Sequence, residues 1–127
     1  MDWTISVPEG TEIIRVELSG DHDTTAITSL LKEVSDKIRE HPTRPLLFDD
    51  RGLDVSRVTP NEMLVSNSMF ADSTLGTSIR RIAILVKSDA EYERAANWSR
   101  MAHTRSMTRL GVFRDETEAI EWLTSNA

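Results

Sequence analysis

The sequence predicts an α/β fold built on a single mainly parallel sheet of about five strands, with an antiparallel hairpin at the N-terminus and four helices. Two observations predict it. Apolar and polar residues alternate near the N-terminus, as in half-buried strands, and further on short apolar runs are separated by segments with helical periodicity. Strands that alternate with helices need crossover connections, which are right-handed and produce a parallel sheet. The expected order is β-β-α-β-α-β-α-β-α.

The composition indicates one acidic domain over residues 1–127. A chain of 127 residues fits one domain, and 39% hydrophobic with 28% charged residues is typical of a globular protein. The net charge of -6 argues against a nucleic-acid partner, since phosphate neutralisation needs basic surfaces. The absence of cysteine excludes disulfides, thiolate metal sites and cysteine nucleophiles. No apolar run approaches the ~18 residues of a membrane span and no leader is recognisable, so no integral membrane segment and a cytoplasmic location are expected.

The first predicted elements are the hairpin and a helix. Two alternating runs contribute Trp3, Ile5 and Val7, then Ile14, Val16 and Leu18. Residues 8–11, Pro-Glu-Gly-Thr, supply a turn between them. Apolar residues at three-four spacing then predict a helix over about residues 24–40, which ends before Pro42.

The middle of the chain predicts a buried strand and a second helix. Leu46–Phe48 is an unbroken apolar run, and the two aspartates that follow it predict that the strand ends there. Thr59 and Glu62 form a capping box around a proline at the first helical position. The second helix therefore starts near residue 60 and loses its pattern in a loop at residues 73–78.

The last part of the chain predicts two more strand-helix pairs. The residues Ile82–Val86 form the most apolar segment and predict a strand covered on both faces. Ser88 with Glu91 opens a third helix that continues to about residue 105. A short strand at residues 110–113 follows, and an acidic capping box at residues 115–118 opens the final helix.

Several motifs together resemble the SpoIIAA-like branch of the STAS superfamily, whose fold is related to CRAL-TRIO lipid-binding domains. Near the C-terminus, the residues Phe113-Arg114-Asp115, Ala119 and Trp122-Leu123 are similar to the closing signature of that family. Also similar are the strand ending in Asp49-Asp50-Arg51-Gly52, the strand from Arg81 to Val86 that runs into Lys87-Ser88-Asp89, and Trp98 in the next helix. The resemblance extends from the second strand to the C-terminus and implies a small non-catalytic regulatory or ligand-binding domain.

The resemblance also raises the question of a phosphorylation switch. In the anti-sigma-factor antagonists of the wider superfamily, a serine in an Asp-Ser sequence after the third strand is phosphorylated by a partner kinase. This chain has two aspartates and Arg51 there, and the first hydroxyls downstream are Ser56 and Thr59. These two residues are the candidate phosphoacceptors, although Thr59 is equally explained as a helix N-cap.

Acidic residues after the second and third predicted strands form a candidate site for catalysis. Residues 21–23, Asp-His-Asp, and the pair Asp49 and Asp50 would meet at one end of the sheet, where α/β folds bind ligands. Such a cluster offers oxygens for a divalent cation and groups for acid-base chemistry. The alternative is that these residues cap a helix, form turns and pair with Arg51 or Arg57. A receiver-type phosphorelay domain, with Lys87 as its lysine, conflicts with the opening hairpin.

The second helix is the main candidate for recognition. It carries more apolar residues than one core-facing stripe needs, among them Met63, Met69 and Phe70. We expect partner or ligand contacts there, with polar contacts from Asp49, Asp50 and Arg51. Arginines crowded after residue 80, near Trp98, either bind an anionic group or form a solvated helix face.

Three functions remain open from the sequence. The first is a non-enzymatic regulatory or binding module that contacts a protein partner or a second copy of itself, with a homodimer as the expected form. The second is a carrier or sensor of an apolar, lipid-like small molecule. The third is a metal-dependent enzyme that uses the acidic loops. The chain has no nucleophile elbow and no phosphate-binding glycine loop, so no hydrolase triad, nucleotide or other cofactor is predicted, and no metal ligands are assigned.

Overall fold

The structure, a computed structural model, describes residues 1–72, 80–103 and 109–125, and of residues 71–72 and 97–103 only the backbone. The strands are β1 (Asp2–Ser6), β2 (Ile14–Asp21), β3 (Leu46–Asp54), β4 (Arg81–Leu85) and β5 (Arg109–Phe113). The helices are the short 3-10 helix η1 (Thr24–Ala26), α1 (Ile27–Glu40), α2 (Pro60–Asp72), α3 (Asp89–His103) and α4 (Glu116–Thr124). The predicted loop at residues 73–78, the end of the third helix at residue 105 and the side chains of Trp98 and Met101 lie outside this description.

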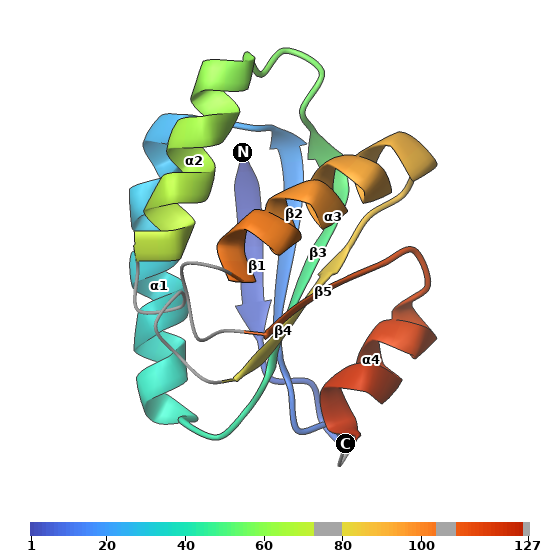
Figure 1. The fold of residues 1–127 in the computed structure, drawn as a ribbon. Helices are drawn as coiled ribbons and strands as arrows, with labels where there is room; N and C mark the ends of the chain where they lie inside the picture. Colours follow the sequence, from blue (N-terminus) through green and yellow to red (C-terminus); the bar gives the residue numbers. More distant parts are fainter. Residues whose placement is uncertain (73–79, 104–108, 126–127) are drawn as a thin grey trace.

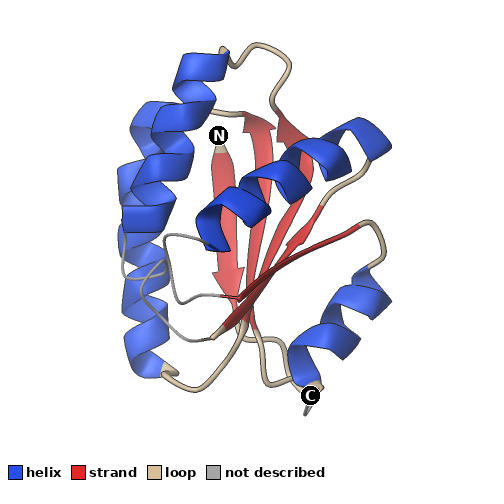
Figure 2. Ribbon diagram, viewed as in Figure 1, coloured by secondary structure: helices blue, strands red, loops and turns tan. Residues whose placement is uncertain are grey.

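The five strands form one sheet in the order β1-β2-β3-β4-β5, shown edge to edge in Figure 2. Strand β1 is antiparallel to β2, and the other neighbouring strands are parallel. The turn of the hairpin is closed by the amide of Thr11, which donates to the carbonyl of Pro8, with Gly10 at φ +77°. The predicted mainly parallel sheet with an N-terminal hairpin is therefore confirmed.

The unbroken strand order determines where the helices lie. Because each crossover moves one strand along the sheet with the same right-handed turn, successive crossover helices fall on the same face. Helices α1, α2 and α3 lie on this face, and α4, which follows the last strand, covers the other (Figure 1). The sheet therefore separates two apolar clusters.

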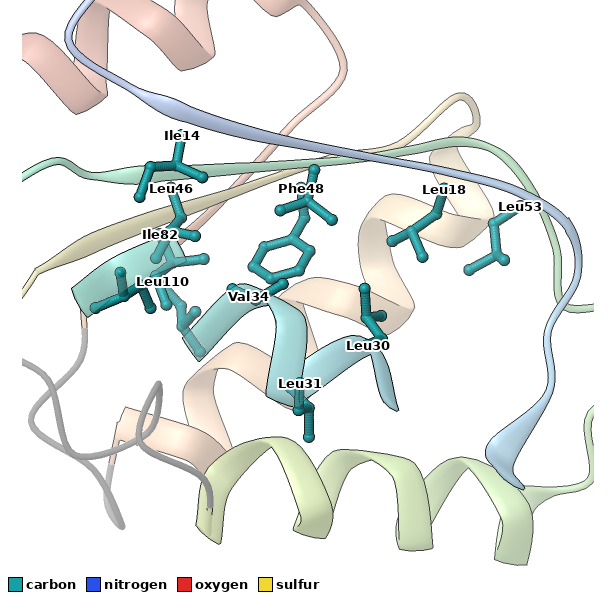
Figure 3. Packing of buried hydrophobic residues seen from close by; sticks show 12 residues of the cluster. Ile14, Leu18, Leu30, Leu31, Val34, Leu46, Phe48, Leu53, Ile82 and Leu110 are labelled. Carbon is teal, nitrogen blue, oxygen red and sulfur yellow. The ribbon is translucent and has the colours of Figure 1, made fainter. Parts of the chain in front are cut away.

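The larger cluster lies between the sheet and helices α1 and α2. Phe48 points from β3 toward α1, where it meets Val34 and Leu30, and Leu31 points toward α2 (Figure 3). Phe48 also packs edge-on against Phe70 of α2, with 5.8 Å between ring centroids. The spacing of apolar residues in α1 predicts one buried face, and the buried residues of this helix lie on it: Leu30, Leu31, Val34 and Ile38.

The smaller cluster under α4 contains the C-terminal signature residues. Phe113 of β5 and Trp122 of α4 lie 5.5 Å apart between ring centroids, and Ala119 is fully buried beside them. A Cβ on Gly111 would lie 2.8 Å from Cε2 of Phe113, so this position leaves no room for a side chain. The C-terminal signature residues therefore form the contact between α4 and β5.

The helix N-termini have the predicted caps. The Thr59 hydroxyl accepts a hydrogen bond from the amide of Glu62 at 3.1 Å. The Ser88 hydroxyl accepts one from the amide of Glu91 at 3.2 Å, and Asp115 accepts one from the amide of Thr117 at 2.8 Å. These interactions position α2 and α3 above the sheet.

Strand β3 is longer than the sequence predicts. Instead of ending at the two aspartates, it continues to Asp54, so Asp49 and Asp50 lie inside a strand and not in a loop. The change from apolar to charged residues at Asp49 predicts the end of the strand, and this prediction is wrong. The charged residues stay in the strand because Asp49 and Arg51 pair with each other and Asp50 faces a cavity.

Candidate functional site

A β-bulge lies at the centre of β3. Glu17 of β2 is paired with Asp49, but Ser19 is paired with Gly52, so β3 contains one more residue than β2 over this stretch. A bulge shifts the alternation of side chains, and bulges are frequent beside functional sites. Here it allows both Phe48 and Leu53 to face the larger apolar cluster although they are five residues apart.

Gly52 makes this bulge sterically possible. A Cβ at this position would lie 3.0 Å from the carbonyl oxygen of Leu18 and 3.3 Å from Cβ of Ser19, both on the neighbouring strand. A side chain here would therefore require β2 and β3 to move apart by a few tenths of an ångström. The glycine that ends the predicted Asp-Asp-Arg-Gly motif has a structural role at the edge of the candidate site.

Asp49 points to the α4 face of the sheet, where it is buried and paired. Its Oδ2 accepts hydrogen bonds from Arg15 at 2.5 Å and from Arg51 at 2.9 Å, and its Oδ1 accepts one from Nε of Arg51 at 2.9 Å. Burial raises the pKa of Asp49, but the hydrogen bonds and charges of the two arginines outweigh this and leave its pKa below the usual value. Arg15 also pairs with Glu116 at the start of α4. The predicted alternative, in which the aspartates hold arginines, is correct for Asp49.

Asp50 points to the opposite face of the sheet, toward α1, α2 and α3. Its Oδ1 is buried and has no hydrogen-bond partner among the described residues. Burial, followed by the negative charges of Asp49 and Glu91, raises the pKa of Asp50 to about 7. A buried carboxyl oxygen without a partner is costly for the fold, so its position calls for a functional explanation.

The Asp50 side chain lines a cavity of about 190 Å³ between the sheet and helices α1, α2 and α3. Most of the wall is apolar, and it is built from segments that are distant in the sequence. Its apolar side chains are Met1, Leu18, Ile27, Leu30, Leu31, Phe48, Leu53, Val55, Met63, Phe70, Ile84, Val86 and Ala95. The polar ones are His22, Asp50, Ser66, Asn67, Glu91 and Arg94. A mainly apolar cavity with a few polar groups is the usual form of a small-molecule site.

A second polar group on the wall joins η1 to α2. Nε2 of His22 lies 3.0 Å from the hydroxyl of Ser66, which lies 3.2 Å from the hydroxyl of Thr24. Ser66 is buried, and burial is the main cause that lowers the pKa of His22 below its usual value. A neutral imidazole that shares a hydrogen bond with Ser66 holds the N-terminal half of α2 against the end of β2.

The recognition residues predicted on α2 face mainly inward. Met63 and Phe70 line the cavity, and Met69 packs against the larger cluster. The exposed apolar side chains of this helix are Leu64, 58% exposed, and Val65, 50% exposed. The surplus of apolar residues seen in the sequence thus divides into a cavity wall and an outer surface. Partner contacts through Met63, Met69 or Phe70 stay a prediction.

Arg51 and the two candidate phosphoacceptors lie outside the cavity wall. Arg51 is half-exposed on the other face of the sheet, beside Asp49. The Ser56 amide donates to Asp54 in the turn before α2, and the Thr59 hydroxyl caps that helix. Phosphorylation at Ser56 or Thr59 stays a prediction, and the capping role of Thr59 is confirmed.

The acidic residues do not form the predicted shared cluster. Asp21 ends β2 and is exposed, and Asp23 caps η1 by accepting from the amide of Thr25 at 3.0 Å. Of the residues expected to meet, His22 and Asp50 reach the same cavity wall. Within the described parts of the chain, no three histidine, aspartate or glutamate side chains are close enough to hold a metal ion.

Several arginines of the second half of the chain have structural partners. Arg80 donates to the carbonyls of Arg44 at 2.8 Å and of Pro42 at 3.0 Å. Arg81 donates to the carbonyl of Trp122 at 2.6 Å and stacks over the Trp122 ring. These contacts give Arg80 and Arg81 structural roles, while the exposed Arg94 lies on the cavity wall.

Sequence reasoning missed three parts of this site. Ser66 and Asn67 look like ordinary polar helix residues, and Glu91 looks like a helix cap. The bulge can be recognised in the sequence from the spacing of the apolar residues in β3. Leu46 and Phe48 are two residues apart, whereas Phe48 and Leu53 are five residues apart. An odd spacing that includes a glycine indicates an extra residue in a strand.

Comparison with solved structures defines the class of the fold. The chain is similar to the crystal structure of an uncharacterised protein of the DUF3478 family with a SpoIIAA-like fold from Shewanella loihica PV-4. The TM-score is 0.65 at 14% sequence identity, and the match covers 96% of this chain and 92% of that one. A sequence model of the SpoIIAA-like family matches residues 13–124, so the chain belongs to the SpoIIAA-like family.

Two further comparisons complete this description. No curated protein matches the chain. None of the helices in the described residues is both long enough and apolar enough to span a bilayer. The family and the fold are therefore defined, and the function must be argued from the cavity.

Proposed function

We propose that this protein is a non-enzymatic binding domain that holds a small, mainly apolar molecule in the cavity between the sheet and helices α1–α3. The observation that carries the proposal is the apolar wall of this cavity, which includes Phe48, Leu30 and Ile84. Filling such a space removes apolar surface from water and restores packing contacts that the empty cavity lacks. A cytoplasmic location and the absence of catalysis are part of the same proposal.

The size of the cavity limits the ligand. An engineered protein cavity of about 150 Å³ binds benzene, so a cavity of about 190 Å³ accommodates one ring with a short chain, or roughly ten non-hydrogen atoms. A long acyl chain needs more room than this volume offers. We therefore narrow the predicted lipid-like ligand to a compact molecule.

A titration with propylbenzene tests the proposal. Two-dimensional NMR spectra of the full chain should show shifts of amide signals concentrated in α1, α2 and β3, whose side chains line the cavity. In addition, native mass spectrometry of freshly purified protein should reveal any retained small molecule as an added mass. Saturable binding of propylbenzene supports the proposal, and no binding at its solubility limit contradicts it.

A pair of alanine variants provides the matched control. Ala95 of α3 lines the cavity, whereas Ala90 of the same helix is exposed and does not. The Ala95→Phe variant should fill the space and abolish propylbenzene binding, while Ala90→Phe should bind as the unchanged protein does. Equal binding by both variants would show that the probe binds elsewhere.

A second candidate function is self-association through α2. It is favoured by Leu64 and Val65, which are adjacent, apolar and at least half exposed. The double variant Leu64→Glu/Val65→Glu should convert a dimer to a monomer in sedimentation velocity, and Asn61→Glu, at an exposed position of the same helix, should not. Charged substitutions at Met69 or Phe70 are unsuitable because these side chains pack against the core. A monomeric unchanged protein would rule out this second function.

A further inference from the structure

We infer that the cavity selects a ligand that carries a cationic nitrogen on its apolar body, and that the carboxylate of Asp50 binds this nitrogen. The inference rests on the proposed function, because it specifies the polar group of the molecule that the cavity holds. Its geometric basis is that Asp50 lines the cavity and that its buried Oδ1 has no hydrogen-bond partner among the described residues. A ligand that donates to this oxygen would satisfy it.

The charges around Asp50 favour a cation. Asp50 itself is acidic, and Asp49 and Glu91 both act to raise its pKa, so the potential at its carboxyl group is negative. Asp49 is already paired with Arg15 and Arg51 on the other face, whereas Glu91 lines the same cavity as Asp50. An ammonium group would therefore meet two carboxylates on the wall, and an anionic ligand would be repelled by both.

The other charged or titratable groups on the wall lie on other segments. They are His22 after β2, Arg94 on α3 and the amino group of Met1. Among the described side chains, those that α1 and α2 contribute to the wall carry no charge: Ile27, Leu30, Leu31, Met63, Ser66, Asn67 and Phe70. No cationic group of the described residues lowers the pKa of Asp50, so its carboxyl lacks a cationic partner among them.

Four probes with the same phenylethyl body separate the possible polar groups. They end in an ammonium, a hydroxyl, a methyl or a carboxylate group: 2-phenylethylamine, 2-phenylethanol, propylbenzene and 3-phenylpropanoate. At pH 8, NMR titration should give a dissociation constant for 2-phenylethylamine about tenfold lower than for propylbenzene, as expected for a hydrogen bond to a charged group. The carboxylate probe should bind most weakly.

The pH dependence provides an independent readout. With a pKa of about 7, the ionised fraction of Asp50 falls about tenfold between pH 8 and pH 6. The affinity for 2-phenylethylamine should fall by about the same factor, since the ammonium binds the ionised carboxylate. The affinity for propylbenzene should rise over the same interval, because the protonated carboxyl is the better neighbour for an apolar group.

The Asp50→Asn variant assigns these effects to one side chain, because it keeps the shape of the residue and removes the charge. It should bind 2-phenylethylamine and propylbenzene with similar affinity and lose the opposite pH profiles. Asp21→Asn, at an exposed position at the end of β2, is the matched control and should behave as the unchanged protein does. Retention of the amine preference in Asp50→Asn would overturn the inference.

The outcomes distinguish this inference from the proposed function. If propylbenzene binds and 2-phenylethanol or 3-phenylpropanoate binds as tightly as the amine, the cavity is a ligand site and the inference about its polar group is wrong. If none of the four probes binds, the proposed function fails together with the inference. If only the amine binds, and its binding survives Ala95→Phe, the ammonium is bound outside the cavity and the inference fails.

Discussion

Asp49 and Asp50 are consecutive residues of β3 whose carboxyl groups lie on opposite faces of the sheet and in opposite surroundings. Two arginines neutralise Asp49, while Asp50 lines an apolar cavity and its buried oxygen has no partner among the described residues. Asp49 is therefore stabilised by its neighbours, whereas Asp50 is destabilised by its burial. This division leads to the first two predictions, which have opposite signs.

We expect Asp50→Asn to stabilise the protein. Because the pKa of Asp50 is raised to about 7, the folded state binds more protons than the unfolded state above about pH 4, so stability is lost as the pH rises. The asparagine variant has no carboxyl group at this position and does not lose stability in this way. The difference between its free energy of unfolding and that of the unchanged protein should therefore grow by roughly 2–3 kcal/mol between pH 5 and pH 8. Urea unfolding at the two pH values measures it. An advantage that is constant with pH would contradict the raised pKa.

We expect Asp49→Asn to destabilise the protein by roughly 2–3 kcal/mol near pH 7, because it leaves two arginines without their shared carboxylate. The estimate is below that for a fully buried pair because Arg15 and Arg51 are partly exposed. Since the pKa of Asp49 is lowered, its stabilising effect is present at neutral pH and is lost as the pH falls into the acid range. The cost of Asp49→Asn should therefore shrink in unfolding experiments at acid pH.

We expect Gly52→Ala to disturb the bulge in β3. The added Cβ would lie 3.0 Å from the carbonyl oxygen of Leu18, so the two strands must separate, at a cost of roughly 1–3 kcal/mol. Gly10→Ala is the comparison: it meets no atom within 4 Å, and its cost of about 1 kcal/mol comes from the positive φ alone. Only Gly52→Ala should also move the amide signals of Asp50 and Leu53. Unchanged signals would show that the strands absorb the methyl group.

We expect Thr59→Ala to cost about 1 kcal/mol, because it removes the hydroxyl that caps α2. Amide hydrogen exchange should become faster in the first turn of α2, beside the cavity wall. Ser56→Ala, in the exposed turn before the helix, should change stability by less than about 0.5 kcal/mol. Equal effects of the two substitutions would contradict the capping role.

The fold could be predicted from the sequence because its signals are local. The alternation of Ile14, Val16 and Leu18 and the stripe from Leu30 to Ile38 reflect the periods of a strand and a helix, and the structure keeps both. The capping residues Thr59 and Asp115 act within three residues of themselves, so tertiary contacts do not alter their roles.

The site could be predicted only in part, because its properties depend on distant residues. In the sequence, Asp49 and Asp50 are equivalent and predict the end of the strand. What distinguishes them is Arg15, which pairs with the buried Asp49 and lies 34 positions away from it. The described cavity wall combines Met1 with residues of three strands and three helices, and no local pattern shows that their side chains leave a space. Met63 and Phe70, which line the cavity, do carry a local signal, because the second helix has more apolar residues than one core-facing stripe needs.

The unbroken strand order also bears on how the protein is made. Each parallel pair is joined by one intervening helix, so a growing chain can add strands to the sheet in the order of synthesis without inserting any between existing ones. The described wall of the cavity extends from Met1 to Ala95, whereas β5 and α4 contribute no described residue to it. Helix α3, which supplies Glu91, Arg94 and Ala95 to the wall, packs against β5, so we expect the wall to be complete only when β5 has paired with β4. A ligand would then meet its complete site only after the last strand has joined the sheet.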